Sequence, residues 1–486
     1  MKLKELLCGI AYNLNGTDPE TEISVPVTDS RRAKKDSLFI CIDGTKRRGT
    51  DYLKNAKDNG AVACVISEAS AKRSELSISC ITVPDTRVAS AVIWNNYYNR
   101  PAEKMRLYGI TGTCGKTTTA GILMGILNSA GRKTGLIGTS GVFSGGRKLE
   151  IQGSETGDIA AAMTTPDPEY LYGALAEMRE NGVTDAVIEV SSHAIYQKKT
   201  EPLSFFCGVF TNLSAEHLDL HGDMESYFAV KKSFLDKCQI LIYNRDDRYG
   251  KRFYPIGYSY GLTNAENVIE HDGYMEFDFV AEEEKIRILS HNIGEFNIYN
   301  ILAAITCARA AGVSPADISN GIFNAPPLSG RMERVTPKDC PVTVYIDYAH
   351  TPAAMEAVLS QLKKTNAENL TVLFGCGGDR DREKRHLMGE TASRYAKRII
   401  VTSDNPRWED PENIIKEILT GIPEGTDVTV IKDRREAILY AVKTSVKGET
   451  IALLGKGHEN YEIVEDRKIP FSEKEILHQA LGFVNG

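Results

Sequence analysis

The last third of the chain alternates apolar, strand-like runs with amphipathic stretches, and no other feature of the sequence limits the possible fold as much. The runs read "VTVYID", "LTVLFG", "RIIVT", "DVTVI" and "TIALLG", and amphipathic stretches lie at 351–364, 382–396, 411–422 and 434–445. Such alternation predicts a parallel, doubly wound α/β sheet of the Rossmann-like kind. Ligands bind outside the carboxyl ends of the strands in these sheets. The clusters "DYAH", "GCGGDRD", "SDNPR" and "GKGHE" each follow a strand, so they predict a binding face.

A second strand–loop–helix junction, "GITGTCGKTTTAG" at 109–121, lies between a strand at 105–111 and a helix at 117–130. The general phosphate-binding loop has a glycine where this chain has Ile110. The glycines stand instead at Gly109, Gly112 and Gly115. They still let backbone N–H groups approach phosphate oxygens, and the helix N-terminus adds a positive dipole. Lys116 can reach the β- and γ-phosphates of a nucleotide. We therefore predict a central, P-loop-type ATPase domain with a parallel sheet; the alternative is a glycine- and threonine-rich turn with a solvated lysine.

Other apolar runs complete the outline. The N-terminal region holds "SLFICI", "AVACVI" and "ISCITV", followed by the amphipathic stretch "TRVASAVIWNNYYN". Strands are also predicted at "DAVIEV", "FCGVFTNL" and "QILIYN" in the middle of the chain. The alternating stretch 257–290 predicts a small antiparallel addition.

Length and charge limit the classes of protein. At ~150 residues per domain, 486 residues suggest about three domains. We place them at 1–100, 101–329 and 330–486, because "NRPAEK" (99–104) reads as a linker and "PPLSGRMERV" (326–335) marks a second boundary. The net charge of −7 gives no electrostatic reason to expect nucleic acid or an anionic membrane as a partner. The cysteines form no C-x-x-C pair, and no apolar run approaches the ~18 residues of a membrane span. We expect a cytoplasmic protein with reduced thiols.

Polar residues gather after the strands of the middle region. "IEVSSHAI" places Glu189, Ser192 and His193 at a strand end, where a carboxylate can bind Mg²⁺. A serine nucleophile is the alternative, but G-x-S-x-G is absent and the adjacent serine and histidine project differently. "TNLSAEHLDLHGD" (211–223) suits either a metal or an ordinary polar loop. The lysine pair in "YFAVKKSFL" (227–235), taken alone, reads as a solvated pair on an amphipathic helix.

Taken in order, these motifs resemble those of the Mur ligase family, the ATP-dependent enzymes that add amino acids to peptidoglycan precursors. They read "TGTCGKTT", "EVSSH", "TNLSAEHLDLHG", "YFAVK", "GEFNIYN", "GRMERV" and "DYAHTP". The glycine spacing of the phosphate loop is similar to that family's own version. The resemblance covers nearly the whole chain. Within the family, "GCGGDRDREKR", "SDNPR" and "GKGHENY" resemble the branch that adds meso-diaminopimelate.

The resemblance implies amide formation through an acyl phosphate, with ATP as a substrate and Mg²⁺ as the metal. The γ-phosphoryl group would pass to the D-glutamate carboxylate of UDP-N-acetylmuramoyl-L-alanyl-D-glutamate, and meso-diaminopimelate would then displace phosphate. All partners would be small molecules, with no nucleic acid and no membrane insertion, and we expect a monomer. Two alternatives stay open: the same ligase with L-lysine as the incoming amino acid, and a P-loop NTPase without ligase activity.

The resemblance also implies a role for individual residues. ATP would contact Gly112, Thr113, Cys114, Gly115, Lys116, Thr117, Thr118, Asn297, Asn300, Arg331 and Asp347. The metal ligands would be Thr117, Glu189, His217 and Lys231, the last carboxylated on Nζ. The UDP-muramoyl dipeptide would contact Ser30, Thr164, Thr165, Ser191, Gln197 and Lys199. Diaminopimelate would contact Arg380, Asp404, Asn405, Pro406, Arg407, Gly455 and Glu459. The catalytic residues among these would be Lys116, Lys231, Glu189, His217 and Arg380.

The chain departs from the family's pattern at three places. Lys199 stands where many relatives have arginine, which keeps the charge but not the bidentate fork. Glu216 stands for the common aspartate, and "GTKRRG" (44–49) replaces a usual loop. The resemblance therefore assigns no uridine contacts to the 44–49 loop and leaves them open.

Overall fold

The computed structural model describes residues 1–44, 47–71, 78–149, 163–271, 273–282, 284–365 and 368–482. Two residues of the 44–49 loop, 45 and 46, therefore lie outside the described chain. The described residues form two compact units. Unit 1 comprises Met1–Thr111, Gly131–Val209 and Val230–Leu241; unit 2 comprises Gly112–Ala130, Phe210–Ala229 and the chain from Ile242 onward. Each unit therefore combines segments that are distant in the sequence.

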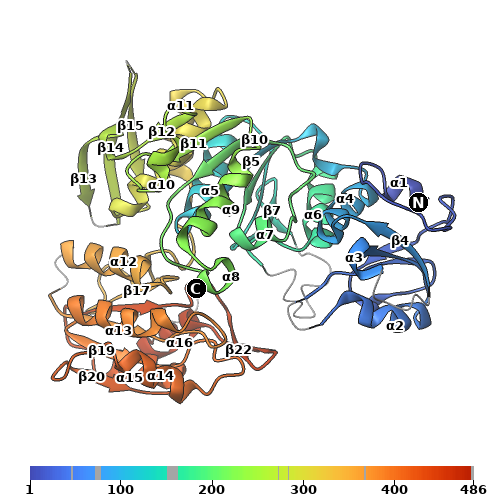
Figure 1. Ribbon diagram of the computed structural model, residues 1–486. Coiled ribbons are helices and arrows are strands. Elements are labelled where there is room, and N and C mark those ends of the chain that lie inside the picture. Colours follow the sequence, from blue (N-terminus) through green and yellow to red (C-terminus); the bar gives the residue numbers. More distant parts are fainter. Residues whose placement is uncertain are drawn as a thin grey trace. The chain divides into compact units, whose positions relative to one another are not determined.

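Unit 1 begins with a parallel sheet in the order β1-β2-β3-β4 (Figure 1). Its elements are α1 (Leu3–Leu6), β1 (Val25–Val27), β2 (Ser37–Ile40), α2 (Leu53–Asp58), β3 (Ala61–Ser67), α3 (Glu68–Ala71), β4 (Ser79–Val83) and α4 (Thr86–Tyr97), with 3-10 turns at Ser30–Arg32, Gly49–Tyr52 and Pro101–Lys104. Successive side chains of a strand point to opposite faces. Leu38 and Ile40 pack with α1 and α4, whereas Phe39 packs with α2, so both faces of the sheet are covered. The predicted strands and helix of this region are confirmed.

The other strands of unit 1 follow the order β10-β5-β9-β6-β7-β8. Their bounds are β5 (Arg106–Thr111), β6 (Thr134–Gly138), β7 (Gly141–Ser144), β8 (Arg147–Leu149), β9 (Asp185–Glu189) and β10 (Phe205–Phe210), and the helices are α6 (Pro168–Glu180), α7 (Ser192–Tyr196) and α9 (Met224–Leu235), which begins in unit 2. β9 pairs in parallel with both β5 and β6, and β6 to β8 continue antiparallel. Parallel pairing places the carboxyl ends of β5 and β9, at Thr111 and Glu189, on the same edge.

Unit 2 begins with the helix that follows the phosphate loop. This helix, α5 (Lys116–Ser129), packs against α10 (Glu295–Ala310) and α11 (Pro315–Asn324). A Cβ on Gly125 would lie only 2.9 Å from Gly321 O, so glycines permit the close approach of α5 and α11. Further elements are α8 (Leu218–His221), β11 (Ile240–Asn244), β12 (Tyr258–Tyr260), β13 (Ala265–His271), β14 (Tyr274–Ala281) and β15 (Glu284–Ser290), with 3-10 turns at Gly250–Phe253 and Leu262–Asn264. The antiparallel sheet β13-β14-β15 confirms the prediction for 257–290.

The C-terminal part of unit 2 is a doubly wound sheet in the order β16-β17-β21-β18-β19-β20. Its pairs from β17 to β20 are parallel, as the alternating pattern predicts, whereas the edge strand β16 pairs antiparallel with β17, so the sheet is mixed. Its elements are β16 (Glu333–Arg334), β17 (Thr343–Asp347), α12 (Pro352–Lys364), β18 (Leu370–Phe374), α13 (Glu383–Tyr395), β19 (Arg398–Val401), α14 (Pro411–Leu419), β20 (Val428–Val430), α15 (Arg434–Lys443), β21 (Thr450–Leu454) and α16 (Glu473–Leu481). Val372 and Phe374 pack with α12 to α14, and Leu373 packs with α15 and α16, so helices cover both faces (Figure 1). The hairpin β22 (Tyr461–Val464) and β23 (Arg467–Pro470) was not predicted, because its four-residue strands are half-exposed and carry little apolar pattern.

Candidate functional site

Two glycines set the path of the phosphate loop between β5 and α5. Gly112 has a φ of 151°, and a Cβ there would lie 1.9 Å from Thr211 Oγ1. Gly115 has a φ of 86° and is the N-cap residue of α5. A side chain at either position would strain or block the loop. Lys116 Nζ donates to Gly112 O at 2.9 Å and to Thr113 O at 2.7 Å, so its ammonium group lies over the loop.

Two residues that follow β10 hold this loop in place. Thr211 Oγ1 donates to Cys114 O at 2.7 Å, and Cys114 N donates to Asn212 Oδ1 at 2.9 Å. Asn212 O also accepts from Thr113 N at 2.9 Å. Burial raises the pKa of the Cys114 thiol to about 11. No role was predicted for Thr211 or Asn212. Both stand at the strand end of the "TNLSAEHLDLHGD" motif, and that position could have indicated a place at the site.

The predicted asparagines of α10 lie against the same loop. Asn300 Nδ2 donates to Asn297 Oδ1 at 2.9 Å, and Asn297 Nδ2 donates to Ile293 O at 2.8 Å. Both side chains are buried. A Cβ on Gly115 would lie 2.3 Å from Asn300 Oδ1, so the amide fills the space that this glycine leaves. The structure thus brings Asn297 and Asn300 to the loop.

Arg331 and Asp347 reach the same region from the C-terminal part of unit 2. Arg331 Nη2 donates to Thr117 Oγ1 at 3.3 Å, and Arg331 Nε is buried without a hydrogen-bond partner in the part of the chain that the structure describes. Asp347 accepts from Met332 N at 2.6 Å and from Ala349 N at 2.7 Å. Burial raises the pKa of Asp347 above its ordinary value, although Arg331 opposes the rise. The nucleotide residues predicted from distant motifs therefore meet within one unit.

His217 lies at the start of α8 with a φ of 57°, next to an ion pair that the sequence did not reveal. Glu216 Oε1 lies 3.2 Å from His350 Nε2 and 3.8 Å from His217 Nε2. Burial raises the pKa of Glu216, but the hydrogen bond and charge of His350 outweigh it, and the pKa falls well below its usual range. His350 Nδ1 lies 2.8 Å from Tyr348 O. Glu216, noted only as a departure from the family's pattern, thus anchors the "DYAH" loop.

Unit 1 holds the predicted carboxylate ligand at the end of β9. Glu189 is fully buried; its Oε1 accepts from Thr139 N at 2.9 Å, and its Oε2 accepts from Thr139 Oγ1 at 3.1 Å. A Cβ on Gly138 would lie 2.1 Å from Glu189 Oε1. Thr139 Oγ1 also lies 3.0 Å from Thr164 Oγ1. Thr139, which the sequence analysis missed, therefore orients Glu189 and joins it to the predicted substrate residue Thr164.

Two predicted lysines of unit 1 are buried. Lys231, on α9, is 1% exposed, and its Nζ lies 3.5 Å from Thr111 Oγ1 at the end of β5. The interpretation of this lysine as solvated is therefore wrong. Lys199 is 3% exposed; its Nζ pairs with Asp167 at 2.7 Å and donates to Thr165 O at 3.2 Å. Lys231 Nζ thus lies at the end of β5, and Lys199 Nζ lies against the segment that leads into α6.

The remaining residues predicted for the muramoyl substrate divide into two places within unit 1. Thr165 Oγ1 donates to Glu189 O at 2.7 Å and accepts from Ser191 N at 3.0 Å. Ser191 caps α7, whose C-cap is Gln197. Thr164, Thr165, Ser191 and Lys199 are thus joined around the end of β9. Ser30 is buried on a 3-10 turn beside the first sheet instead.

The loops after β19 and β21 bring four of the residues predicted for the amino acid together in unit 2. Asn405 Nδ2 donates to Glu459 Oε2 at 2.8 Å. Burial, and then the charge of Asp404, raise the pKa of Glu459. A Cβ on Gly455, which has a φ of 112°, would lie 2.6 Å from Asp404 Oδ2. Lys456, which was not predicted, donates to Asn405 Oδ1 at 3.0 Å and fixes this amide.

Arg407 directs its guanidinium toward the loop after β18. Its Nη1 donates to Gly378 O at 2.9 Å and to Asn405 O at 3.3 Å. Its φ is 53°, and its N donates to Ile463 O at 3.0 Å, so β22 supports this backbone. Burial, and then the positive charge of Arg380, lower the pKa of Arg407. Two guanidinium groups therefore repel one another here, and a carboxylate bound beside both would relieve the repulsion.

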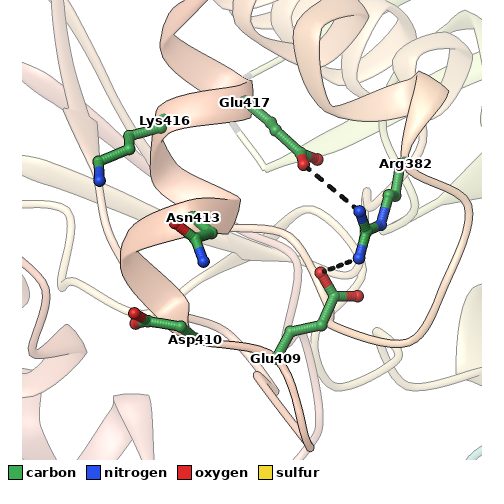
Figure 2. A pocket seen from close by; sticks show the side chains of 6 residues that line it. All are labelled: Arg382, Glu409, Asp410, Asn413, Lys416 and Glu417. Atoms are coloured by element: carbon green, nitrogen blue, oxygen red, sulfur yellow. Dashed lines mark hydrogen bonds and ion pairs between the residues drawn. The ribbon is translucent and has the colours of Figure 1, made fainter.

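A further arginine ties together the loops that carry these groups. Arg385, on α13, is fully buried; its Nη1 donates to Glu409 Oε2 at 3.0 Å and to Glu417 Oε2 at 2.7 Å, and its Nη2 lies 3.3 Å from Gly377 O. Glu409 also accepts from Asp379 N at 2.6 Å. Figure 2 shows Arg382 reaching the same two glutamates at the rim of a pocket of about 390 Å³. The carbonyl oxygen of Pro406 lies against Gly378, because a Cβ on Gly378 would lie only 1.9 Å from it.

No three side chains of His, Cys, Asp or Glu gather as a metal-binding group among the residues that the structure describes. In the same described ranges, no helix is both long enough and apolar enough to cross a bilayer.

The sequence matches two domain families and many curated proteins. The Mur ligase middle domain matches residues 110–308, and the family described as Mur ligase, glutamate ligase domain matches residues 330–457. A relative from Clostridium acetobutylicum, named UDP-N-acetylmuramoyl-L-alanyl-D-glutamate--2,6-diaminopimelate ligase 1, is 36% identical over 491 residues, with 99% of each chain covered. A ligase of the same name, without the numeral, from Aquifex aeolicus is 38% identical over 465 residues, covering 93% of this chain and 92% of the relative.

Solved structures are similar over nearly the same length. A structure of a UDP-N-acetylmuramoyl-L-alanyl-D-glutamate--2,6-diaminopimelate ligase has a TM-score of 0.66 and 27% identity, with 99% of each chain covered. The MurF ligase of Thermotoga maritima, solved in complex with ADP, has a TM-score of 0.60 and 16% identity, covering 89% of this chain and 94% of that one. These similarities confirm the predicted α/β fold.

Proposed function

The chain belongs to the Mur ligase family, and we propose that it is the ATP-dependent ligase that joins meso-diaminopimelate to UDP-N-acetylmuramoyl-L-alanyl-D-glutamate in peptidoglycan precursor synthesis. Two relatives that carry the name of this reaction are 36% and 38% identical to it over nearly their whole length. The observation on this chain that carries the proposal is the cluster of Asp404, Asn405, Arg407 and Glu459. It offers carboxylates and a guanidinium together, which suits an amino acid with two ammonium and two carboxylate groups.

We propose that ATP binds the phosphate loop and donates its γ-phosphoryl group to the D-glutamate carboxylate. The N–H groups of the loop and Lys116 neutralise phosphate charge, and Asn297 and Asn300 support the loop from α10. Arg331 suits the γ-phosphate, because its buried Nε has no protein partner among the described residues and its Nη2 lies beside Thr117. Stabilisation of the phosphoryl group by such charges is the main catalytic term in this chemistry.

The proposed metal is Mg²⁺, and its proposed ligands are Thr117, Glu189, His217 and Lys231. The buried carboxylate of Glu189, oriented by Thr139, suits a hard cation, which prefers oxygen ligands. Reaction of the buried Lys231 amine with CO₂ would form a carbamate and supply oxygen ligands where the unmodified side chain has none. When bound, Mg²⁺ supplies charge neutralisation for the transferring phosphoryl group.

We propose that the muramoyl substrate contacts Thr164, Thr165, Ser191, Gln197 and Lys199 in unit 1, with Ser30 as the uridine contact. The Lys199 ammonium group is held by Asp167 and Thr165 and remains a cation suited to a substrate carboxylate. Lysine here contributes a point charge rather than the flat fork of arginine.

The amine then attacks the acyl phosphate. The new C–N bond forms as the C–O bond to phosphate breaks, and the amine loses a proton. We propose that Asp404 and Glu459 bind ammonium groups of diaminopimelate, while Arg407 binds the distant carboxylate and Arg380 binds the second carboxylate or the oxyanion. Close docking of the substrates supplies the proximity that the reaction needs.

We propose three further properties of the protein: its domain bounds, its state and location, and the class of its substrates. The domains are 1–100, 101–329 and 330–486, supported by the matched family segments at 110–308 and 330–457. The protein acts as a monomer in the cytoplasm. Its substrates are small molecules, as they are for the relatives by name.

Phosphate release from ATP tests the proposed function. With the muramoyl dipeptide present, we expect release that depends on an amino acid and is much faster with meso-diaminopimelate than with L-lysine. A preference for L-lysine would favour the lysine-adding ligase. Release that is unchanged when the dipeptide is omitted would favour an NTPase without ligase activity.

A further inference from the structure

Tyr348 lies between the nucleotide residues and the amino-acid residues of unit 2. It directly follows Asp347 at the end of β17, and its N donates to Gly330 O at 2.9 Å, one residue before Arg331. On its other side, a Cβ on Gly457, which has a φ of 56°, would lie 2.7 Å from Tyr348 Cβ. The backbone of Tyr348 is therefore held between the "GRMERV" loop and the "GKGHE" loop.

The aromatic ring of Tyr348 supports Arg331. The Arg331 guanidinium carbon lies 4.7 Å from the ring centroid, within the range of a cation–π contact. The same guanidinium donates to Thr117 Oγ1 at 3.3 Å. Because the ring covers one face of the guanidinium, it limits the directions in which Arg331 can point. The ring thus orients the arginine that we propose for the γ-phosphate.

The hydroxyl group of Tyr348 reaches Glu459. Tyr348 Oη donates to Glu459 Oε1 at 3.5 Å, while Glu459 Oε2 accepts from Asn405 Nδ2 at 2.8 Å. The two carboxylate oxygens are thus held by different residues on different strand ends. Loss of the hydroxyl would leave Glu459 held on one side only.

We propose that Tyr348 is a positioning residue that aligns both substrates at once: its ring seats Arg331 for the nucleotide, and its hydroxyl orients Glu459 for the incoming amine. This inference rests on the proposed function for its account of the amino acid. It differs from a general structural role because ring and hydroxyl act on different substrates, and a substitution can remove one without the other.

The test compares Tyr348→Phe, which removes the hydroxyl, with Tyr348→Leu, which also removes the ring. Phosphate release is measured while ATP or meso-diaminopimelate is varied, and binding of a non-hydrolysable ATP analogue is measured without amino acid. For Tyr348→Phe we expect KM for diaminopimelate to rise about three- to tenfold, with KM for ATP within about twofold of wild type. For Tyr348→Leu we expect the affinity for the ATP analogue to fall as well, by about three- to tenfold, because the analogue keeps the γ-phosphate that Arg331 is proposed to bind.

Tyr395→Phe is the matched control, because it removes a hydroxyl that bonds Glu356 on the surface of α12. It should change neither KM. Equal rises in both KM values for Tyr348→Phe, no rise for diaminopimelate, or unchanged affinity for the ATP analogue in a folded Tyr348→Leu would each overturn the proposal. If Tyr348→Leu fails to fold, the two KM values of Tyr348→Phe still decide. Absence of amino-acid-dependent release in wild type would instead refute the proposed function, whatever the variants do.

Discussion

At the scale of single residues, the protein prepares charged groups before they meet a substrate. Arg407 is an example, since two backbone carbonyls, Gly378 O and Asn405 O, already orient its guanidinium. Burial is the largest cause that lowers the pKa of Arg407, and the positive charge of Arg380 lowers it further. A group held in this way loses little freedom on binding, so its contact with a carboxylate contributes more of its full strength.

We expect Arg407→Ala to abolish the preference for meso-diaminopimelate over L-lysine. The two amino acids differ by the carboxylate that Arg407 is proposed to bind, a contact worth ~1.5–3 kcal/mol. This corresponds to a fall of about 10- to 100-fold in kcat/KM for diaminopimelate, with little change for lysine. The control is Arg435→Ala. Arg435 is an exposed residue of α15, and its guanidinium donates to Gln479 on α16. A variant that keeps its preference would show that Arg407 does not read this carboxylate.

Lys231→Ala should lose most activity, and short carboxylates such as formate or acetate should restore part of it. The reason is that a small carboxylate can take the place of the proposed carbamate in the space that the removed side chain leaves. Lys231 is 1% exposed, whereas its neighbour Lys232 is half-buried and pairs with Asp236, so Lys232→Ala is a matched control. Full activity of Lys231→Ala, or a loss that no carboxylate restores in a folded variant, would argue against the carbamate.

At the scale of elements, buried ion pairs hold the strand-end loops in register. Arg385 and Glu409 join the loop after β18 to the loop after β19, which carries Arg407. The hydrogen bond from Arg385 lowers the pKa of Glu409 below its ordinary value of 4.5. A group whose pKa is lower in the folded state stabilises the fold above its unfolded pKa and loses that contribution as the pH falls through the folded value.

Glu409→Gln should therefore lower the free energy of unfolding near neutral pH by about 1.5–3 kcal/mol, because a charged partner of Arg385 is lost. The difference in unfolding temperature between wild type and variant should shrink as the pH falls below the ordinary value of 4.5. Thermal unfolding at several pH values measures this. Glu412→Gln changes an exposed glutamate of α14 that pairs with Lys432, and it should have little effect at any pH. If the difference in unfolding temperature between wild type and Glu409→Gln stayed the same at every pH, Glu409 would not titrate as described.

At the scale of the whole molecule, the proposed nucleotide contacts come from two of the proposed domains. Lys116 and Thr117 lie in 101–329, and Arg331 and Asp347 lie in 330–486. We predict that a nucleotide bound by both sets favours a closed arrangement of these domains.

We expect ATP or a non-hydrolysable analogue, together with Mg²⁺ and the muramoyl dipeptide, to reduce the radius of gyration measured by small-angle X-ray scattering. Lys116→Ala, with a weakened phosphate loop, should show a smaller change at the same ligand concentrations. Identical scattering curves for free and fully liganded wild type would contradict closure of the proposed domains.

The sequence by itself determined the elements and the positions of the loops. Strand and helix alternation in the C-terminal region, the glycines of the phosphate loop and the polar clusters at strand ends were all predicted and lie where expected. These features are local, because the side-chain periods of strands and helices and the backbone freedom of glycine act over a few neighbouring residues. The family motifs added the candidate residues, but not the contacts among them.

Only the tertiary structure decided which side chains touch. Thr211 bonds Cys114 across 97 positions of the chain, Tyr348 bonds Glu459 across 111, and Arg331 bonds Thr117 across 214. Burial of Lys231, which the local pattern assigned to a solvated helix face, likewise depends on the strand end that packs against it. A hydrogen bond forms only within a few tenths of an ångström of its ideal length. The order of residues along a chain does not carry distances of that precision; the packing of distant elements produces them.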